Sequence, residues 1–345
     1  MDSIALPQSL FLFHLAREFT KLHSYSIPTT YDSVTPKRIA IHVSLFIITF
    51  FTITVAGVQW LNLDAFDLNN FPAGIPYSLA ILFILTCHEF GHYYAARYHK
   101  VDATLPYFIP FPNLPGIMNF GTLGALIKTK SAIPSKKIMF DIGAAGPIAG
   151  FLATLLILSY GFFSLPGKEF ILSIHPEYFS QHQPPGSISL TFGNSLLYQI
   201  LSIVFTNPTN QFVPPMTEMY HYPFLCAGWF GLFVTAMNLL PVGQLDGGHL
   251  AYTMFGTNHK VIARSAFVII LVIGLLGLLP FAYPSISLGW TGWLFWALIL
   301  FFVIKLDHPP VLDETPLDSS RKNIGWATFG ILVLSFIPTP FTIPL

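Results

Sequence analysis

Long apolar runs alternate with short polar segments along most of this chain. Crossing the hydrocarbon core of a bilayer, which is about 30 Å thick, takes about 20 apolar helical residues. Runs of about this length cover Ala40–Trp60, Tyr77–Arg97, Ile142–Phe163, Pro223–Leu240, Val261–Phe281, Ile286–Ile304 and Ile324–Ile337. The last run is the shortest and is followed by Pro338 and Pro340. The pattern predicts an all-α polytopic membrane protein with about seven transmembrane helices.

Composition supports the membrane assignment. Of the 345 residues, 53% are hydrophobic and only 9% are charged, and the mean hydropathy is +0.62, which is typical of a membrane protein. The formal net charge is zero, so no basic surface for nucleic acid is expected. We therefore expect the lipid bilayer, and no nucleic acid, as a partner. The loops are too short for separate domains, so residues 1–345 are expected to form a single integral membrane domain.

The basic residues predict an orientation. If the amino terminus lies in the cytoplasm and the seven spans alternate, all of the 16 Lys and Arg residues except Lys168 fall on the cytoplasmic side or at its boundary. Short cytoplasmic loops are enriched in Lys and Arg. We therefore expect a multi-pass protein of the cell (inner) membrane, with an organelle membrane as the alternative. Residues 1–38 would form a cytoplasmic or interfacial segment, with an amphipathic helix near Ser9–Leu22.

Two histidines and a glutamate lie inside the second apolar run, in the sequence His88-Glu89-Phe-Gly-His92. Residues four apart share one face of a helix, so both imidazoles can bind the same zinc ion. Glu89 lies one step round the helix, where it can take a proton from an activated water. Ionisable residues at membrane depth are costly and indicate function. This pattern predicts a metal site inside the membrane.

A hydrolytic zinc site needs a third protein ligand and an open position. His99 shares the helix face, but it lies about 10 Å beyond His92 along the helix, which is too far. The better candidate is Asp246, in Asn238-Leu-Leu-Pro-Val-Gly-Gln-Leu-Asp-Gly-Gly-His249. The proline and glycines of this segment should unwind the end of a helix, and irregular backbone at membrane depth needs protein or a polar cavity beside it.

In this order, HExxH and NxxPxxxLDG resemble the two motifs of the intramembrane site-2 protease family of zinc metalloproteases. Gly121–Ile127 and Gly143–Gly150 are similar to the family's re-entrant strand and to the start of its middle core helix. The resemblance implies a catalytic core at about 77–250, with three helices and a small re-entrant β segment, and additional transmembrane helices at 260–345. No interval is large enough for the PDZ-type domain of the best-known bacterial members.

The resemblance also implies roles for single residues. His88, His92 and Asp246 would bind one Zn²⁺ per chain, Glu89 would be the general base, and Asn238 would contact the substrate carbonyl or its oxyanion. We further expect the strand residues Gly121, Thr122, Leu123 and Gly124 to bind an extended substrate at the strand's edge. The expected function is a zinc metalloendopeptidase that cleaves transmembrane segments of membrane-protein substrates within the bilayer.

Other interpretations stay open. A related protease class uses a glutamate as third ligand, and the downstream glutamates are Glu169, Glu177, Glu218 and Glu314, none of which lies in a helical ExxxD pattern. The same buried His, Glu and Asp could form a proton relay in a transporter, although the repeats expected of many transporters are not found. A non-proteolytic binder of membrane proteins is a third alternative, against which the intact Glu89 argues.

Some remaining features receive simpler interpretations. Gly146 and Gly150 are spaced for close helix packing. His249 has two interpretations, a residue that supports the metal ligands from behind and a polar residue at the membrane surface, and we favour the second. We interpret Asp307-His308-Pro-Pro as a solvated turn.

An eighth run, Ile188–Phe205, contains Ser, Thr, Asn and Gln residues. If it crossed the bilayer, Asp246 and the two histidines would lie at opposite ends of a core about 30 Å thick. We therefore predict that it lies along the outer interface or dips in and returns.

Overall fold

The computed structural model describes residues 35–112, 119–179, 190–207, 211–283, 286 and 288–342. Its helices are α2 (Pro36–Trp60), α3 (Phe71–Tyr98), α4 (Lys136–Phe163), α5 (Lys168–Ile174), α6 (Leu196–Phe205), α7 (Pro223–Asn238), α8 (Asp246–Phe255), α9 (His259–Leu276), α10 (Gly292–Leu298, continued as a π-helix over Ile299–Ile304) and α11 (Ser319–Ser335). Short 3₁₀ turns cover Leu68–Asn70, Met219–His221, Gly256–Asn258 and Leu279–Phe281. The strands are β1 (Tyr107–Pro110), β2 (Thr122–Leu126), β3 (Thr191–Phe192) and β4 (Phe341–Thr342). The predicted amphipathic helix Ser9–Leu22 lies outside the described residues.

The chain is mostly helical, and helices occupy all seven predicted runs. Four helical segments of the described residues are long and apolar enough to cross a membrane: Pro36–Trp60, Leu68–Tyr98, Lys136–Phe163 and Asp246–Phe281. The helices in the other three predicted runs, α7, α10 and α11, are shorter than this. The membrane-protein character of the chain follows from the four long helices, whereas the count of seven spans stays a prediction.

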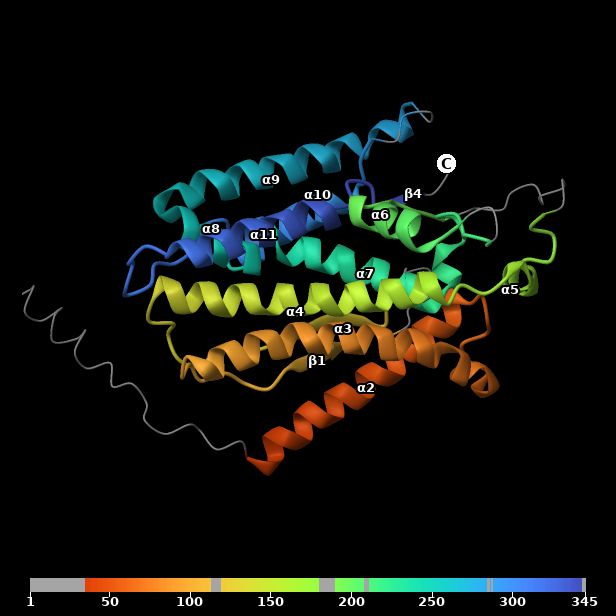
Figure 1. The fold of residues 1–345 in the computed structure, drawn as a ribbon, viewed down its shortest axis with the longest axis horizontal. Coiled ribbons are helices and arrows are strands. Elements are labelled where there is room, and N and C mark those ends of the chain that lie inside the picture. Colours follow the sequence, from red (N-terminus) through yellow and green to blue (C-terminus); the bar gives the residue numbers. More distant parts are fainter. Residues whose placement is uncertain are drawn as a thin grey trace, which may run out of the picture. The chain divides into compact units, whose positions relative to one another are not determined.

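The shortness of α7 has a physical reason. Trp229, Leu232 and most other side chains of this helix are buried, because α7 packs against α3, α4 and α11. In Figure 1, α4 lies between α3 and α7, and α7 is flanked on its other side by α11. A helix that is enclosed by protein does not have to match the thickness of the hydrocarbon core. The helices α3, α4 and α7 pack against one another in pairs.

The start of α4 is capped at Ser135, whose hydroxyl accepts a hydrogen bond from the amide of Ile138 at 3.3 Å. Such a cap satisfies an amide that has no partner within the helix. The helix then packs closely against α3, because a Cβ at Gly91 would lie 2.5 Å from the carbonyl oxygen of Ala145. This close approach brings α4 beside the histidines of α3.

The segment between α3 and α4 carries a two-stranded antiparallel sheet. β1 and β2 pair with Tyr107 opposite Leu126, and the register shifts between Phe108 and Pro110. The predicted strand over Gly121–Ile127 is therefore present as Thr122–Leu126, whereas β1 was not predicted. Gly121 has a positive φ of 80°, and a Cβ there would lie 2.3 Å from the Cα of Ile53, so glycine lets β2 approach α2 closely.

The eighth apolar run contains β3 and the short helix α6. β3 pairs with β4, which lies near the carboxyl end of the sequence. The helix α6 follows β3 and is capped at Ser195, whose hydroxyl accepts a hydrogen bond from the amide of Tyr198. Ten helical residues extend about 15 Å, which is half the thickness of the hydrocarbon core. This length agrees with a segment that does not cross the bilayer, and its position relative to a membrane stays a prediction.

Candidate metal centre

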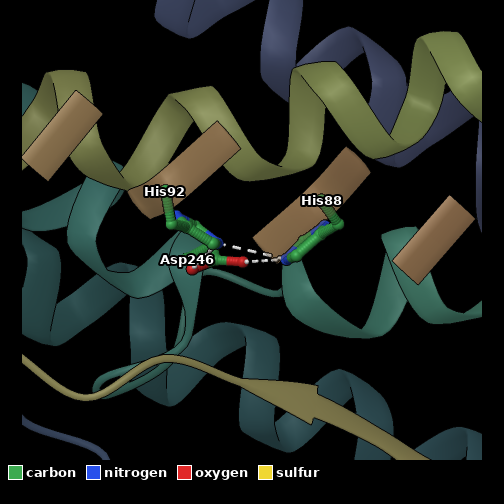
Figure 2. A group of neighbouring side chains, drawn as sticks. All are labelled: His88, His92 and Asp246. Carbon is green, nitrogen blue, oxygen red and sulfur yellow. Dashed lines mark hydrogen bonds and ion pairs between the residues drawn. The ribbon is translucent and has the colours of Figure 1, made fainter. Parts of the chain in front are cut away.

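Two histidines of α3 and one aspartate converge on one point (Figure 2). The Nε2 atoms of His88 and His92 lie 3.1 Å apart. Asp246 places Oδ2 at 3.4 Å from Nε2 of His88 and Oδ1 at 3.3 Å from Nε2 of His92. Both histidines are buried, and only 16% of the Asp246 side chain is exposed. Three donor atoms therefore form a small triangle inside the protein.

Asp246 reaches this point because the backbone after α7 is irregular. The chain turns between Asn238 and α8, whose first residue is Asp246. Gly243 has a positive φ of 56°, and a Cβ at Gly247 would lie 1.9 Å from the carbonyl oxygen of Leu239. Only glycine fits this fold of the chain without strain. The unwinding expected from the proline and glycines is therefore present, and it carries Asp246 to the histidines.

Two glycines of α4 make room for the imidazoles. A Cβ at Gly146 would lie 2.1 Å from Nε2 of His92, and a Cβ at Gly150 would lie 3.0 Å from Nδ1 of His88. The interpretation of these glycines as helix-packing residues was incomplete, because they face the histidine rings themselves. Any larger residue at position 146 would displace His92.

The donor set fits a zinc ion. The Nδ1 atom of His92 lies 2.8 Å from the carbonyl oxygen of Ile142, to which it donates its hydrogen, so its Nε2 lone pair points to Asp246 and His88. In a tetrahedral site with Zn–N bonds of about 2.0 Å, neighbouring ligand atoms lie about 3.3 Å apart. The three observed separations, 3.1, 3.3 and 3.4 Å, agree with this geometry. Two imidazoles and a carboxylate are also ligands that suit zinc.

Glu89 and Asn238 lie beside this triangle. Glu89 is 5% exposed, and the backbone amide of Ile127, which directly follows β2, hydrogen-bonds its carboxylate. Asn238, the last residue of α7, places Nδ2 at 3.4 Å from Nε2 of His88. Both residues and the three donors line one cavity of about 500 Å³. The structure thus brings together all five residues predicted to carry the chemistry.

The four predicted substrate-binding residues are in different surroundings. Gly121 is buried against α2, and Thr122, 8% exposed, donates its hydroxyl hydrogen to the carbonyl oxygen of Ile109 at 2.8 Å. Leu123 is 67% exposed, and Gly124 has open space around it. Leu123 and Gly124 line a second, largely apolar cavity of about 410 Å³, together with residues of α3, α7 and α10. Asn238 lines both cavities.

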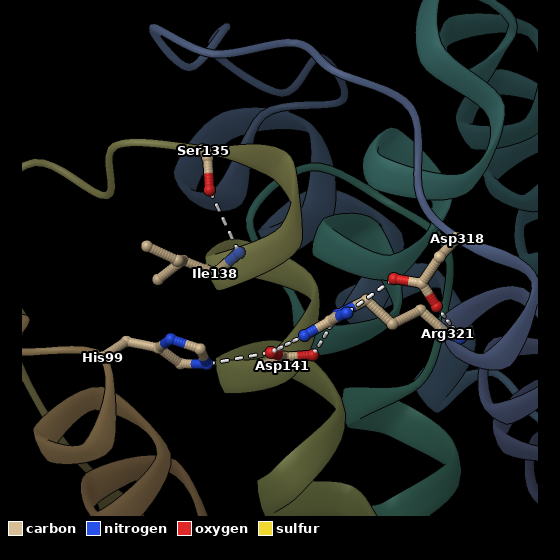
Figure 3. A network of polar contacts seen from close by, with 6 residues as sticks. All are labelled: His99, Ser135, Ile138, Asp141, Asp318 and Arg321. Atoms are coloured by element: carbon tan, nitrogen blue, oxygen red, sulfur yellow. Dashed lines mark hydrogen bonds and ion pairs between the residues drawn. The ribbon is translucent and has the colours of Figure 1, made fainter.

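His99 has a different partner. Its Nε2 lies 2.8 Å from Oδ2 of Asp141 on α4, and Arg321 of α11 donates to both oxygens of the same carboxylate at 2.8 and 2.7 Å (Figure 3). Arg321 also pairs with Asp318. His99 thus takes part in an ion network that joins α3, α4 and α11.

One residue of the cavity, His308, was not predicted from the sequence. His308 is 6% exposed, its Nε2 lies 2.7 Å from Nδ1 of His249, and both rings line the 500 Å³ cavity. Burial, together with the neighbouring His249, lowers the pKa of His308 to about 4. The interpretation of His308 as part of a solvated turn was therefore wrong. Position 308 has no fixed spacing to the motifs. Its place in the cavity depends on its contact with His249, which is far away in the sequence.

The glutamates considered as alternative ligands lie elsewhere. Glu218 lies with His175 and His221 in a separate group, and Glu314 accepts a hydrogen bond from Nζ of Lys136 at 3.1 Å. Among the described residues, the donor group that contains His88 and His92 is completed by Asp246.

These features define a helix-rich membrane protein with a buried His-His-Asp donor group beside a glutamate. Residues 76–281, more than half of the chain, match the sequence model of Peptidase family M50. The chain therefore belongs to Peptidase family M50. The predicted membership in the site-2 protease family is confirmed.

The chain is also similar to curated plant proteins. It is 28% identical over 306 residues to "Probable zinc metalloprotease EGY2, chloroplastic" of Oryza sativa subsp. indica, which covers 86% of this chain and 50% of that protein. It is 32% identical over 268 residues to "Probable zinc metalloprotease EGY1, chloroplastic" of Arabidopsis thaliana, which covers 77% of this chain and 43% of that protein. The chain thus spans about half the length of the curated relatives it matches.

Proposed function

We propose that this chain is a zinc metalloendopeptidase that cleaves transmembrane segments of membrane proteins within the bilayer. The observation that carries the proposal is the buried triangle of His88, His92 and Asp246, with separations of 3.1 to 3.4 Å, beside Glu89 on a helix of spanning length. Membership in Peptidase family M50 and the names of the relatives support the same activity.

One zinc ion would be held by the Nε2 atoms of His88 and His92 and by the carboxylate of Asp246. When bound, it supplies a Lewis acid that polarises the scissile carbonyl and lowers the pKa of water. The hydrogen bond from Nδ1 of His92 to Ile142 fixes the ring in the orientation that binding needs.

Glu89 is the general base in this proposal. Its carboxylate accepts a proton from the attacking water and then delivers this proton to the nitrogen of the leaving amine. The hydrogen bond from the amide of Ile127 holds the carboxylate at the wall of the 500 Å³ cavity, next to His88. Because Ile127 directly follows β2, the strand that would hold the substrate also positions the base.

Asn238 is proposed to stabilise the oxyanion of the tetrahedral intermediate. Its Nδ2 lies 3.4 Å from Nε2 of His88, so its amide hydrogens can reach a substrate oxygen near the donor triangle. A preorganised donor of this kind acts on charge that develops in the transition state. The position of Asn238 on the walls of both cavities places it where the apolar cavity meets the polar one.

The substrate would bind along β2. A transmembrane helix hides its carbonyls in its own hydrogen bonds, so it has to be unwound before cleavage. β1 covers one edge of β2, and no described strand covers the other. An extended peptide can add to this edge, with its apolar side chains in the cavity that Leu123 and Gly124 share with Trp290 and Trp293. The partner is therefore a membrane protein with a transmembrane helix.

The proposal includes the topology derived from the charges. Residues 1–345 form one membrane domain with seven spans, the core lies at about 77–250, the amino terminus is cytoplasmic, and β1–β2 is re-entrant. The inner cell membrane is the proposed location, and an organelle membrane is the alternative that the names of the relatives favour.

Cleavage by the purified protein tests the proposal. In liposomes that contain a single-span substrate, the wild type should cleave inside the span, and Glu89→Gln should keep its zinc and lose cleavage, since the amide accepts no proton. Glu169→Gln, which changes a glutamate in the first turn of α5, is the matched control and should cleave normally. Wild-type cleavage by Glu89→Gln would overturn the assignment of the base. Failure of the wild type to cleave any span tested would favour the transporter or the non-proteolytic binder.

A further inference from the structure

A second group of two histidines and one carboxylate lies away from the first. His175, Glu218 and His221 each offer one ligand atom, and these atoms lie within 4.8 Å of one another. The Nε2 atoms of the two histidines are 3.0 Å apart, and Oε2 of Glu218 lies 3.5 Å from Nε2 of His175 and 3.6 Å from Nε2 of His221. We call the first triangle the catalytic cluster and this one the α5–α7 cluster.

The α5–α7 cluster joins segments from different parts of the fold. His175 directly follows α5, whereas Glu218 and His221 precede α7 by a few residues. The 16 residues of α7 separate this cluster from the catalytic cluster, which lies beside the last residue of the helix. At 1.5 Å per residue the two clusters are about 24 Å apart along α7. They are therefore two sites and cannot share an ion.

The hydrogen bonds of the α5–α7 cluster do not satisfy all three of its ligand atoms. His221 is 2% exposed and donates its Nδ1 hydrogen to the carbonyl oxygen of Trp60, so its Nε2 presents a lone pair to the cluster. Oε2 of Glu218 is buried and has no hydrogen-bond partner. A buried acceptor without a donor is costly. A hydrogen on Nε2 of His175 can serve one of the other two atoms, whereas a cation serves all three.

We propose that His175, Glu218 and His221 bind a second zinc-class ion, in addition to the one expected per chain. Their separations of 3.0, 3.5 and 3.6 Å lie around the value of about 3.3 Å for a tetrahedral zinc site. Water would take the fourth position. The ion would link the end of α5 to the start of α7. The hydrogen bond from His221 to the carbonyl oxygen of Trp60 connects this site to the end of α2.

The role is structural. In the catalytic cluster, Glu89 lies beside the three donors and is free to act as base. In the α5–α7 cluster, the glutamate is itself one of the donors. Its metal should therefore stabilise the fold and leave the rate of peptide cleavage unchanged.

Zinc content measured by mass spectrometry on the purified full-length protein tests the proposal. After dialysis against buffered zinc at about the nanomolar level, well below the range of weak surface binding, the wild type should retain two zinc ions per chain. His175→Ala and Glu218→Gln should each retain one, Asp246→Ala should also retain one, and Asp246→Ala combined with His175→Ala should retain none.

The variants are chosen so that loss of zinc is not caused by loss of the fold. The His175 side chain is 37% exposed and Glu218→Gln keeps its shape, so both should fold, whereas His221 is tightly enclosed. His42→Gln is the matched control, because His42 is also buried and its Nδ1 contacts a carbonyl oxygen, that of Pro106, at 3.0 Å. This variant should retain two ions.

Two results would overturn the inference. In the first, the wild type retains a single zinc ion, and Asp246→Ala removes it. In the second, His175→Ala and Glu218→Gln proteins still retain two zinc ions per chain. A zinc count that Asp246→Ala leaves unchanged would instead contradict the catalytic site and not the second one.

Discussion

The catalytic cluster and the α5–α7 cluster have nearly the same donors and nearly the same shape. Each combines two imidazole Nε2 atoms with one carboxylate, and the two imidazole nitrogens lie 3.1 Å apart in one and 3.0 Å apart in the other. Each also has a histidine whose Nδ1 is bonded to a backbone carbonyl oxygen, His92 to Ile142 and His221 to Trp60.

The surroundings differ. The catalytic cluster has Glu89 and Asn238 beside it, and a cavity of about 500 Å³ opens over its donors. The α5–α7 cluster uses its glutamate as a donor, and its histidines join two chain segments. Under the two proposed assignments, a donor triangle alone would hold a structural ion, whereas hydrolysis also needs a base that is not a ligand and space for a substrate.

Removing one carboxylate from each cluster should give the largest contrast. Asp246→Ala should reduce cleavage to background, because two imidazoles leave the coordination incomplete. Glu218→Gln should cleave at the wild-type rate. The measurement is the initial rate of cleavage of a liposome-embedded substrate by both proteins. Equal losses of activity in the two variants would break the distinction between a catalytic and a structural site.

Asn238→Ala should lower kcat about 100-fold, because one oxyanion donor is lost. KM and zinc content should stay close to wild-type values, since Asn238 is not among the three metal donors. Steady-state kinetics with zinc analysis of the same preparation checks this. A variant that loses zinc together with kcat would show that Asn238 supports the metal and not the substrate oxygen.

Gly146→Ala should weaken zinc binding at the catalytic cluster by at least about 10-fold, an effect typical of changes that misorient a ligand. The added Cβ would lie 2.1 Å from Nε2 of His92 and push the ring away. Gly330→Ala on α11 is the matched control, because a Cβ there meets nothing within 4 Å. Competition with a chelator measures both affinities. Unchanged affinity in Gly146→Ala would show that α4 can shift away from His92.

The smallest expected effect concerns His308, which lines the catalytic cavity. Its pKa is lowered from 6.5 to about 4. Between these two pKa values the imidazole of His308 is protonated in the unfolded chain but not in the folded chain. The free energy of unfolding therefore falls as the pH falls through this window. Between about pH 7 and about pH 5 the wild type should lose at most about 2 kcal/mol through this residue, because solvent screens part of the effect. His308→Gln should lack this part of the loss, as thermal unfolding at both values would show. Identical pH dependence in the two proteins would contradict the burial argument.

Local spacing explains how much of the catalytic site could be predicted from the sequence. His88 and His92 are one helical turn apart, so their pairing follows from helix geometry. Asp246 lies far downstream, and it was identified through glycine- and proline-rich backbone and a family motif. The α5–α7 cluster has no such signal, because His175 and Glu218 meet only when the helices pack.

The fold likewise combines local features with contacts between distant parts of the chain. The long helices follow from runs of apolar residues, whereas the short length of α7 depends on the neighbours that enclose it. β3 and β4 are two residues each and lie about 150 residues apart in the sequence, so no alternation of apolar and polar residues could reveal them. His308 lies in the cavity because it contacts His249, a residue that is far from it in the sequence.

The most direct test of the central claim is a proteomic comparison of membranes that contain either the wild type or Glu89→Gln. If the chain is an intramembrane protease that uses Glu89 as its base, new peptide ends should map inside transmembrane segments with the wild type. The same segments should stay intact with Glu89→Gln. Membranes with identical peptide ends in both samples, or new ends confined to loops outside the bilayer, would contradict the account.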